Sequence, residues 1–187
     1  DGEGRRFAVV CGVEDHDAKP DSANRPRKLS HVVLNAADAD GSAGLLIDRL
    51  GFSLRDETRM FKFLGCNADH HCVAFAFAEE ATLNHIAFEM PDLESVMRGA
   101  GNLVDAGHRI EWGVGRHGPG NNVFAYFLGP EDFAIEYTAE VSQVDESYPV
   151  GGPDEWKWPP GRVDHWGISP PPSDRLKAAQ TRIRFAQ

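Results

Sequence analysis

An internal repeat is the feature of this sequence that most constrains its fold. The segments SHVVLN, around His31, and NHIAFE, around His85, place their histidines 54 residues apart, and each segment is followed by a helical pattern and then by strand patterns. A supersecondary unit that recurs in this way predicts two copies packed against each other. We therefore expect an α+β fold in which paired βαβββ units, at about residues 29–80 and 83–140, form a curved, incomplete β-barrel.

Helices and strands are predicted from hydrophobic periodicity and from their stop signals. The expected helices are Asp38–Arg49 and Asp92–Ala106. The expected strands are Phe7–Val13, Leu29–Leu34, Thr58–Gly65, Cys72–Ala78, Leu83–Met90, Ile110–Gly113, Val123–Leu128 and Phe133–Thr138. The Gly-Pro-Glu-Asp sequence at 129–132 is typical of the turn in a β-hairpin, so the last two strands are expected to pair.

Three regions follow from this pattern. Residues 1–28 are interpreted as the end of a truncated N-terminal module plus a linker, and residues 29–143 as the catalytic domain. Residues 144–187 are rich in Trp and Pro and are expected to form an irregular tail that ends in a short basic helix. Trp156, Trp158 and Trp166 could anchor this tail on an apolar surface or on a second subunit, which makes a homo-oligomer plausible.

Composition excludes several classes of partner. The chain of 187 residues has 41% hydrophobic residues, but no apolar run approaches the roughly 18 residues that span a bilayer, so no membrane partner is expected. The net charge of −10 disfavours nucleic acid, whose phosphates are also negative. Cys11, Cys66 and Cys72 are odd in number and form no CxxC pair, so a reducing cytoplasm is the expected location.

One carboxylate lies in an apolar strand and needs a partner. Glu136 alternates with Ile135 and Tyr137, so it points away from those bulky neighbours. A buried carboxylate is costly unless a metal or a counter-charge compensates it. His31 and His85 occupy matched strand positions and would face the same concavity, so the three residues predict a metal site of two imidazoles and one carboxylate, the arrangement typical of non-haem Fe(II) oxygenases.

Three other polar side chains are expected near this site. His71 begins a strand and could shuttle protons, and His117 lies in the Gly-rich loop GRHGPG. Tyr126 shares parity with core residues, so only its hydroxyl is expected to reach the site. Surface or structural roles are expected for His16, His70, His108 and His165. An apolar lining or the core could use Phe61, Phe63, Phe75, Trp112 and Phe124.

These motifs resemble the type I extradiol, or meta-cleaving, catechol dioxygenases of the vicinal oxygen chelate superfamily. The resemblance covers about residues 27–140 and rests on SHVVLN, HHCVAFAF, LNHIAFEM and GRHGPGNNVFAYFLGPEDFAIEY. It implies that His31, His85 and Glu136 bind Fe(II), with Mn(II) also possible, and that His71 is an acid/base. It further implies that His117 and Tyr126 hydrogen-bond the substrate, an aromatic diol whose ring is cleaved with O2 in aromatic-compound degradation.

Two alternatives to the dioxygenase remain open at this point. Glyoxalase-like isomerases and thiol transferases of the same superfamily usually carry a carboxylate at the end of both repeats, whereas Val73–Phe77 contains none. A metal-free protein of the bleomycin-resistance type would sequester a ligand in the same cleft. Such a protein would not need His31, His85 and Glu136 together.

Overall fold

The computed structural model describes residues 1–14, 17 and 19–185. The first unit consists of β1 (Lys28–Ala36), α1 (Ala39–Leu50), β2 (Ser53–Glu57), β3 (Phe61–Gly65) and β4 (Val73–Phe77). The second consists of β5 (Thr82–Glu89), α2 (Leu93–Asp105), β6 (Trp112–Arg116), β7 (Val123–Leu128) and β8 (Ala134–Ala139). The duplicated βαβββ order that the repeat predicts is therefore confirmed.

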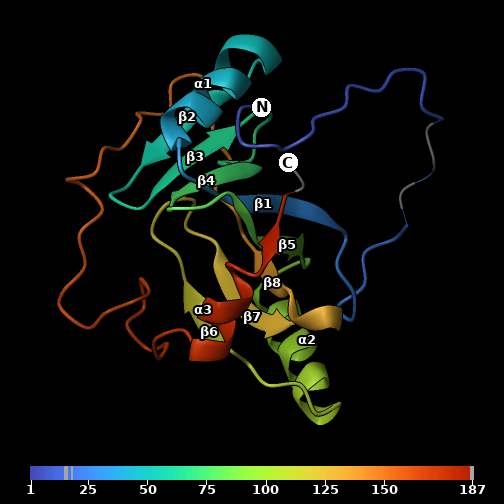
Figure 1. The fold of residues 1–187 in the computed structure, drawn as a ribbon. Helices are drawn as coiled ribbons and strands as arrows, with labels where there is room; N and C mark the ends of the chain where they lie inside the picture. The colour runs from blue at the N-terminus through green and yellow to red at the C-terminus, as the bar shows by residue number, and fades with distance from the viewer. Residues whose placement is uncertain (15–16, 18, 186–187) are drawn as a thin grey trace.

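The two units join into one open sheet through their first strands. The strand order is β2-β3-β4-β1-β5-β8-β7-β6, and β1 pairs with β5 in antiparallel fashion at the centre. Each first strand also pairs in parallel with the last strand of its own unit, β1 with β4 and β5 with β8. Figure 1 shows β1 and β5 in the middle of the molecule, where the two units meet, with α1 and α2 at opposite ends. The sheet does not close between β2 and β6, so the predicted incomplete barrel is confirmed.

Each helix covers the outer face of its own unit. The helices begin at Asp38 and Asp92, whose carboxylates accept backbone N–H groups of the first turn, as expected for N-cap residues. Two separate apolar clusters result from this packing. One contains Leu46 of α1 and Phe75 of β4, and the other contains Val96 of α2. The inner face of the sheet carries buried polar side chains beside a third apolar cluster.

The C-terminal segment covers part of that inner face. It follows an irregular course and then forms α3 (Asp174–Ala179) and the short strand β9 (Ile183–Arg184), which pairs with β5. Leu176 of α3 is fully buried in a cluster with Phe124 and Tyr126 of β7. Figure 1 shows this segment running outside the sheet before α3 packs near β7 and β6. The tail packs against the two units, but the expected terminal helix ends at Ala179, and Ile183–Arg184 forms a strand because it pairs with β5.

Three predictions about strands were wrong. Residues 7–13 form no strand, and Val9 and Val10 lie exposed, because no neighbouring strand pairs with them. Ser53–Glu57 forms β2, where no strand was predicted, and the next strand begins at Phe61 rather than Thr58 because residues 58–60 turn between the two. The strand expected at Ile110–Gly113 lies at Trp112–Arg116.

Within the described ranges, no helix is both long enough and apolar enough to cross a membrane.

Candidate metal centre

Three donor side chains from three central strands meet on the inner face of the sheet. One donor atom from each of His31 (β1), His85 (β5) and Glu136 (β8) lies within 4.8 Å of the others, and all three residues are buried. The Nε2 atoms of His31 and His85 each lie 3.1 Å from Oε2 of Glu136. The repeat explains this convergence, because β5 pairs with both β1 and β8 and presents matched positions to one point.

The hydrogen bonds behind His85 fix which of its nitrogens carries the proton. Asn84 donates through Nδ2 to Asn35, so its own Oδ1 is the acceptor for Nδ1 of His85 at 2.8 Å. His85 must therefore carry its proton on Nδ1, and burial lowers the pKa of the ring, which keeps it neutral. Its Nε2 lone pair then faces a carboxylate oxygen 3.1 Å away. Two acceptors in such contact repel each other unless a cation lies between them, so this donor set fits a metal ion.

Glu136 is the only acidic member of this group, and it is completely buried. Burial by itself would raise its pKa, but the neighbouring imidazoles, His31 above all, outweigh burial and hold the pKa well below the usual range. Asn122 donates to Oε1 at 3.2 Å, and the Tyr126 hydroxyl donates to Oε2 at 2.9 Å. The carboxylate is thus ionised and oriented, as a metal ligand requires.

The structure brings all three of the other predicted site residues to this point. The His71 ring lies against His31, with ring centroids 4.5 Å apart. Nε2 of His117 lies 3.2 Å from the Tyr126 hydroxyl and 3.7 Å from Oε1 of Glu136. Burial lowers the pKa of His71 well below its ordinary value and that of His117 to about 4, so both rings are neutral bases at neutral pH. The Tyr126 ring is buried in the core and only its hydroxyl reaches the group, as predicted.

Aromatic rings surround the polar group, although not all the rings that were expected. Phe63 contacts His71 at 5.1 Å between centroids, and Phe124 stacks on His117 at 4.0 Å. Trp112 lies 5.3 Å from His117 and stacks on Tyr126. Phe75, in contrast, packs under α1 on the outer face of the sheet, so of the two roles expected for it the structure shows the core. These rings make one wall of the site apolar.

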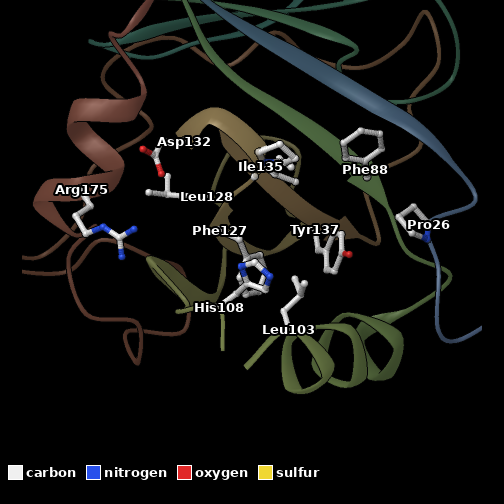
Figure 2. A pocket seen from close by; sticks show the side chains of 12 residues that line it. Pro26, Phe88, Leu103, His108, Phe127, Leu128, Asp132, Ile135, Tyr137 and Arg175 are labelled. Atoms are coloured by element: carbon white, nitrogen blue, oxygen red, sulfur yellow. The ribbon is translucent and has the colours of Figure 1, made fainter. Parts of the chain in front are cut away.

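A separate apolar groove of about 600 Å³ lies on the other face of the second unit. Figure 2 shows Phe127, Ile135 and Tyr137 at this groove, near Leu103 of α2. Ile135 and Tyr137 flank Glu136 in β8, and successive side chains of a strand point to opposite faces. The groove is therefore separated from the candidate metal centre by the sheet itself.

The remaining histidines lie outside the group formed by the three donors. His108 lines the outer groove, and His165 packs near Trp158. His16 lies outside the described residues. His70 is completely buried and hydrogen-bonds His71, so it is structural rather than superficial. Strand periodicity does not predict this contact, because two successive residues in extended backbone normally point in opposite directions. The only sequence signal for it was that His70 and His71 are adjacent.

The duplicated βαβββ architecture and a His-His-Glu group inside its concavity define a protein of the vicinal oxygen chelate class. Residues 28–137 match the family described as the Glyoxalase/Bleomycin resistance protein/Dioxygenase superfamily. The chain belongs to this superfamily.

Relatives of the chain carry the names of ring-cleaving enzymes and of a glyoxalase. Metapyrocatechase 2 of Cupriavidus necator is 31% identical over 131 residues, which are 67% of this chain and 41% of the relative. Biphenyl-2,3-diol 1,2-dioxygenase of Metapseudomonas furukawaii is 32% identical over 132 residues, 65% of this chain and 43% of the relative. The solved Mn(II)-bound glyoxalase from Novosphingobium aromaticivorans is 38% identical, with a TM-score of 0.69, over 77% of this chain and 47% of that one. The chain thus spans less than half the length of each of these three proteins.

Proposed function

We propose that this chain carries the active site of an extradiol dioxygenase, which cleaves the ring of a catechol-type diol with O2 at a non-haem Fe(II) ion. The observation that carries the proposal is the convergence of two imidazoles and one carboxylate, from His31, His85 and Glu136, beside three further hydrogen-bonding side chains. The relatives named metapyrocatechase and biphenyl-2,3-diol dioxygenase support the same chemistry.

The residues around the metal site each have a distinct part in this proposal. The metal ion would hold the diol beside O2 and stabilise developing negative charge. His71, neutral and buried, would accept a proton from the diol and return it later in the reaction. Tyr126 and His117, hydrogen-bonded to each other at 3.2 Å, would hydrogen-bond the substrate oxygens and fix the orientation of the ring. The rings of Phe63 and Trp112 would exclude water from the bound diol.

A glyoxalase-like isomerase is the second candidate, because one solved relative is named a Mn(II)-bound glyoxalase. Enzymes of that kind usually have a carboxylate at the end of both repeats. The strand registers pair Ala87 with Glu136 in the second unit and Val33 with Ala74 in the first, so Ala74 occupies the position equivalent to Glu136. With an alanine there, the first unit has no second carboxylate to offer, and this favours the dioxygenase.

Anaerobic metal loading followed by substrate and air separates the two candidates. We expect the chain, loaded with one equivalent of Fe(II) or Mn(II), to consume O2 with a panel of substituted catechols and to form yellow ring-fission products. The hemithioacetal of methylglyoxal and glutathione should not be isomerised. The His85→Ala variant, which lacks one proposed ligand, should neither retain the metal nor turn over. Isomerase activity without O2 uptake would show that the chain is a glyoxalase-like isomerase. Binding of catechols without any product would show that it is a ligand-binding protein rather than a dioxygenase.

Replacing Tyr126 by Phe tests the role of its hydroxyl apart from metal binding. The hydroxyl donates to Glu136 Oε2 at 2.9 Å and lies 3.2 Å from His117. Loss of such an outer partner typically reduces metal affinity or activity by about 10–100-fold. We expect Tyr126→Phe to keep its metal at saturating concentrations while kcat falls by about that factor. The control is Phe127→Tyr, which adds a hydroxyl on the outer face of the same strand instead of removing one from the inner face. This variant should leave kcat unchanged.

A further inference from the structure

A buried pair of side chains lies behind His71, on the side away from the candidate metal ligands. Nδ1 of His70 lies 3.0 Å from Nδ1 of His71, and Nε2 of His70 lies 2.8 Å from Oδ2 of Asp56. His70 and Asp56 are both completely inaccessible to solvent. A polar pair this deep is costly unless its hydrogen bonds are satisfied, so its arrangement calls for an explanation.

The hydrogen bonds of Asp56 determine which group donates and which accepts in the series Asp56–His70–His71. Its Oδ1 accepts the backbone N–H of Gly151 at 2.8 Å, and its Oδ2 accepts the Tyr148 hydroxyl at 3.1 Å. An ionised carboxylate only accepts, so Nε2 of His70 must be the donor to Oδ2. A neutral His70 then has no proton on Nδ1. Because the two Nδ1 atoms are 3.0 Å apart and share one proton, that proton belongs to His71.

We propose that Asp56 and His70 are positioning residues that hold His71 as the tautomer protonated on Nδ1, with the lone pair of Nε2 free for the substrate. This inference rests on the proposed function for its consequence in catalysis, but not for the tautomer itself. Among the described residues, none is hydrogen-bonded to Nε2 of His71. A base with its lone pair fixed in this way is ready to accept a proton from a bound diol, and Asp56 would stabilise the charge that His71 then acquires.

The orientation of the two rings is also fixed by packing. Gly120 has a φ of +74°, and a Cβ there would lie 2.9 Å from Cε1 and 3.0 Å from Nδ1 of His71. The backbone N–H of His70 donates to Ser142 O at 2.8 Å, and that of Ser142 donates to Gly120 O at 2.9 Å. Tyr148 covers the other ring, with its centroid 5.4 Å from that of His70. The segment 142–151 therefore supports His71 through His70 rather than serving only as a linker to the tail.

Replacing Asp56 by Asn should reverse the chain of donors. The Gly151 N–H still requires an acceptor, so the amide oxygen should remain beside Gly151, and the NH2 group should face His70 and Tyr148. His70 would then accept at Nε2 and carry its proton on Nδ1. His71 would in turn be left with a bare Nδ1 and a proton on Nε2, which removes the lone pair from the active site.

Long-range ¹⁵N–¹H correlation spectra of the histidine rings in the metal-free full chain test the tautomer directly. We expect protonated Nδ1 and bare Nε2 for His71, with the reverse pattern for His70, and both patterns should invert in the Asp56→Asn variant. A His71 protonated on Nε2 in the unaltered protein, or a doubly protonated His70 at neutral pH, would overturn the proposal. This measurement needs no turnover, so its result stands even if no catechol is cleaved.

Kinetics of the metal-loaded enzyme then test the consequence. We expect Asp56→Asn to lower kcat by about 100-fold, in the range of losses typical of general acid-base catalysts, while KM changes less than about threefold. Asp69→Asn is a matched control, because Asp69 is also buried and precedes His70, but its carboxylate binds Lys28 and Gln143 instead. In a His71→Ala background, Asp56→Asn should have no further effect on kcat. An equal loss of kcat with and without His71 would show that Asp56 does not act through His71 and would contradict the positioning role.

Discussion

Glu136→Gln is expected to abolish both metal binding and turnover while leaving the fold intact. The substitution keeps the shape of the side chain but removes the only acidic ligand of the candidate centre. Loss of even an outer partner of a metal ligand costs about 10–100-fold in affinity, so loss of the carboxylate itself should exceed about 100-fold. We expect turnover to fall below detection at metal concentrations that saturate the unaltered protein.

Thermal unfolding distinguishes this outcome from a general loss of stability. A metal at 100 times its dissociation constant should stabilise the unaltered chain by about 2.7 kcal/mol. For a chain of this size each kcal/mol corresponds to roughly 2–4 °C, so Tm should rise by about 5–11 °C. The Glu136→Gln variant should show no such rise. Its metal-free Tm should be unchanged or higher, because an amide N–H can donate to the Nε2 lone pair of His85 that the carboxylate opposes.

The exposed Glu94 on α2 provides the control, since its ion pair with Arg98 is a surface pair worth little. The Glu94→Gln variant should bind metal and turn over normally. If the Glu136→Gln variant retained the metal-induced rise in Tm, the ion would have to bind elsewhere, and the ligand assignment would be wrong.

The three candidate metal ligands could be predicted from the sequence because each lies in a regular strand of a repeat. His31 and His85 share one position of the duplicated unit, and Glu136 breaks an apolar alternation. Strand periodicity fixes the face on which a side chain lies, and the repeat fixes which strands are neighbours. Together these two rules were enough to bring three distant residues to one point.

The support behind His71 could not be predicted in the same way, because it lies in segments without a clear pattern. The strand β2, with the sequence SLRDE, has Asp56 as its fully buried residue. Hydrophobic periodicity therefore does not predict this strand, because that method expects the buried positions to be apolar. Asp56 is recognisable only through its partners His70, Tyr148 and Gly151, which lie up to 95 residues away. Neither propensity nor spacing encodes such contacts.

In the N-terminal and C-terminal segments, local sequence pattern does not predict structure or burial. Residues 7–13 have a strand composition but no neighbour to pair with, so local propensity did not become structure. Leu176, in contrast, lies in a short polar helix and is nevertheless completely buried against β7. In both cases tertiary packing, rather than local sequence, decides the outcome.

Phe75→Ala should destabilise the fold more than any substitution at the candidate site. The ring is completely buried where β4 packs under α1, in the cluster that contains Leu46 and Leu64. Removal of such a ring costs about 3–5 kcal/mol, since the apolar contacts are lost and the surrounding helix and sheet close the cavity only in part. We expect the free energy of unfolding in urea to fall by that amount and Tm to fall by roughly 6–20 °C.

Phe77→Ala is the matched control, because Phe77 lies in the same strand but is 43% exposed. It should cost less than about 1 kcal/mol. Below its lowered Tm, the Phe75→Ala variant should still bind metal with nearly unchanged affinity, because Phe75 lies on the outer face of the sheet and the candidate ligands on the inner one. A large loss of metal affinity with little loss of stability would instead mean that Phe75 acts on His71 through β4, and that the two faces are not independent.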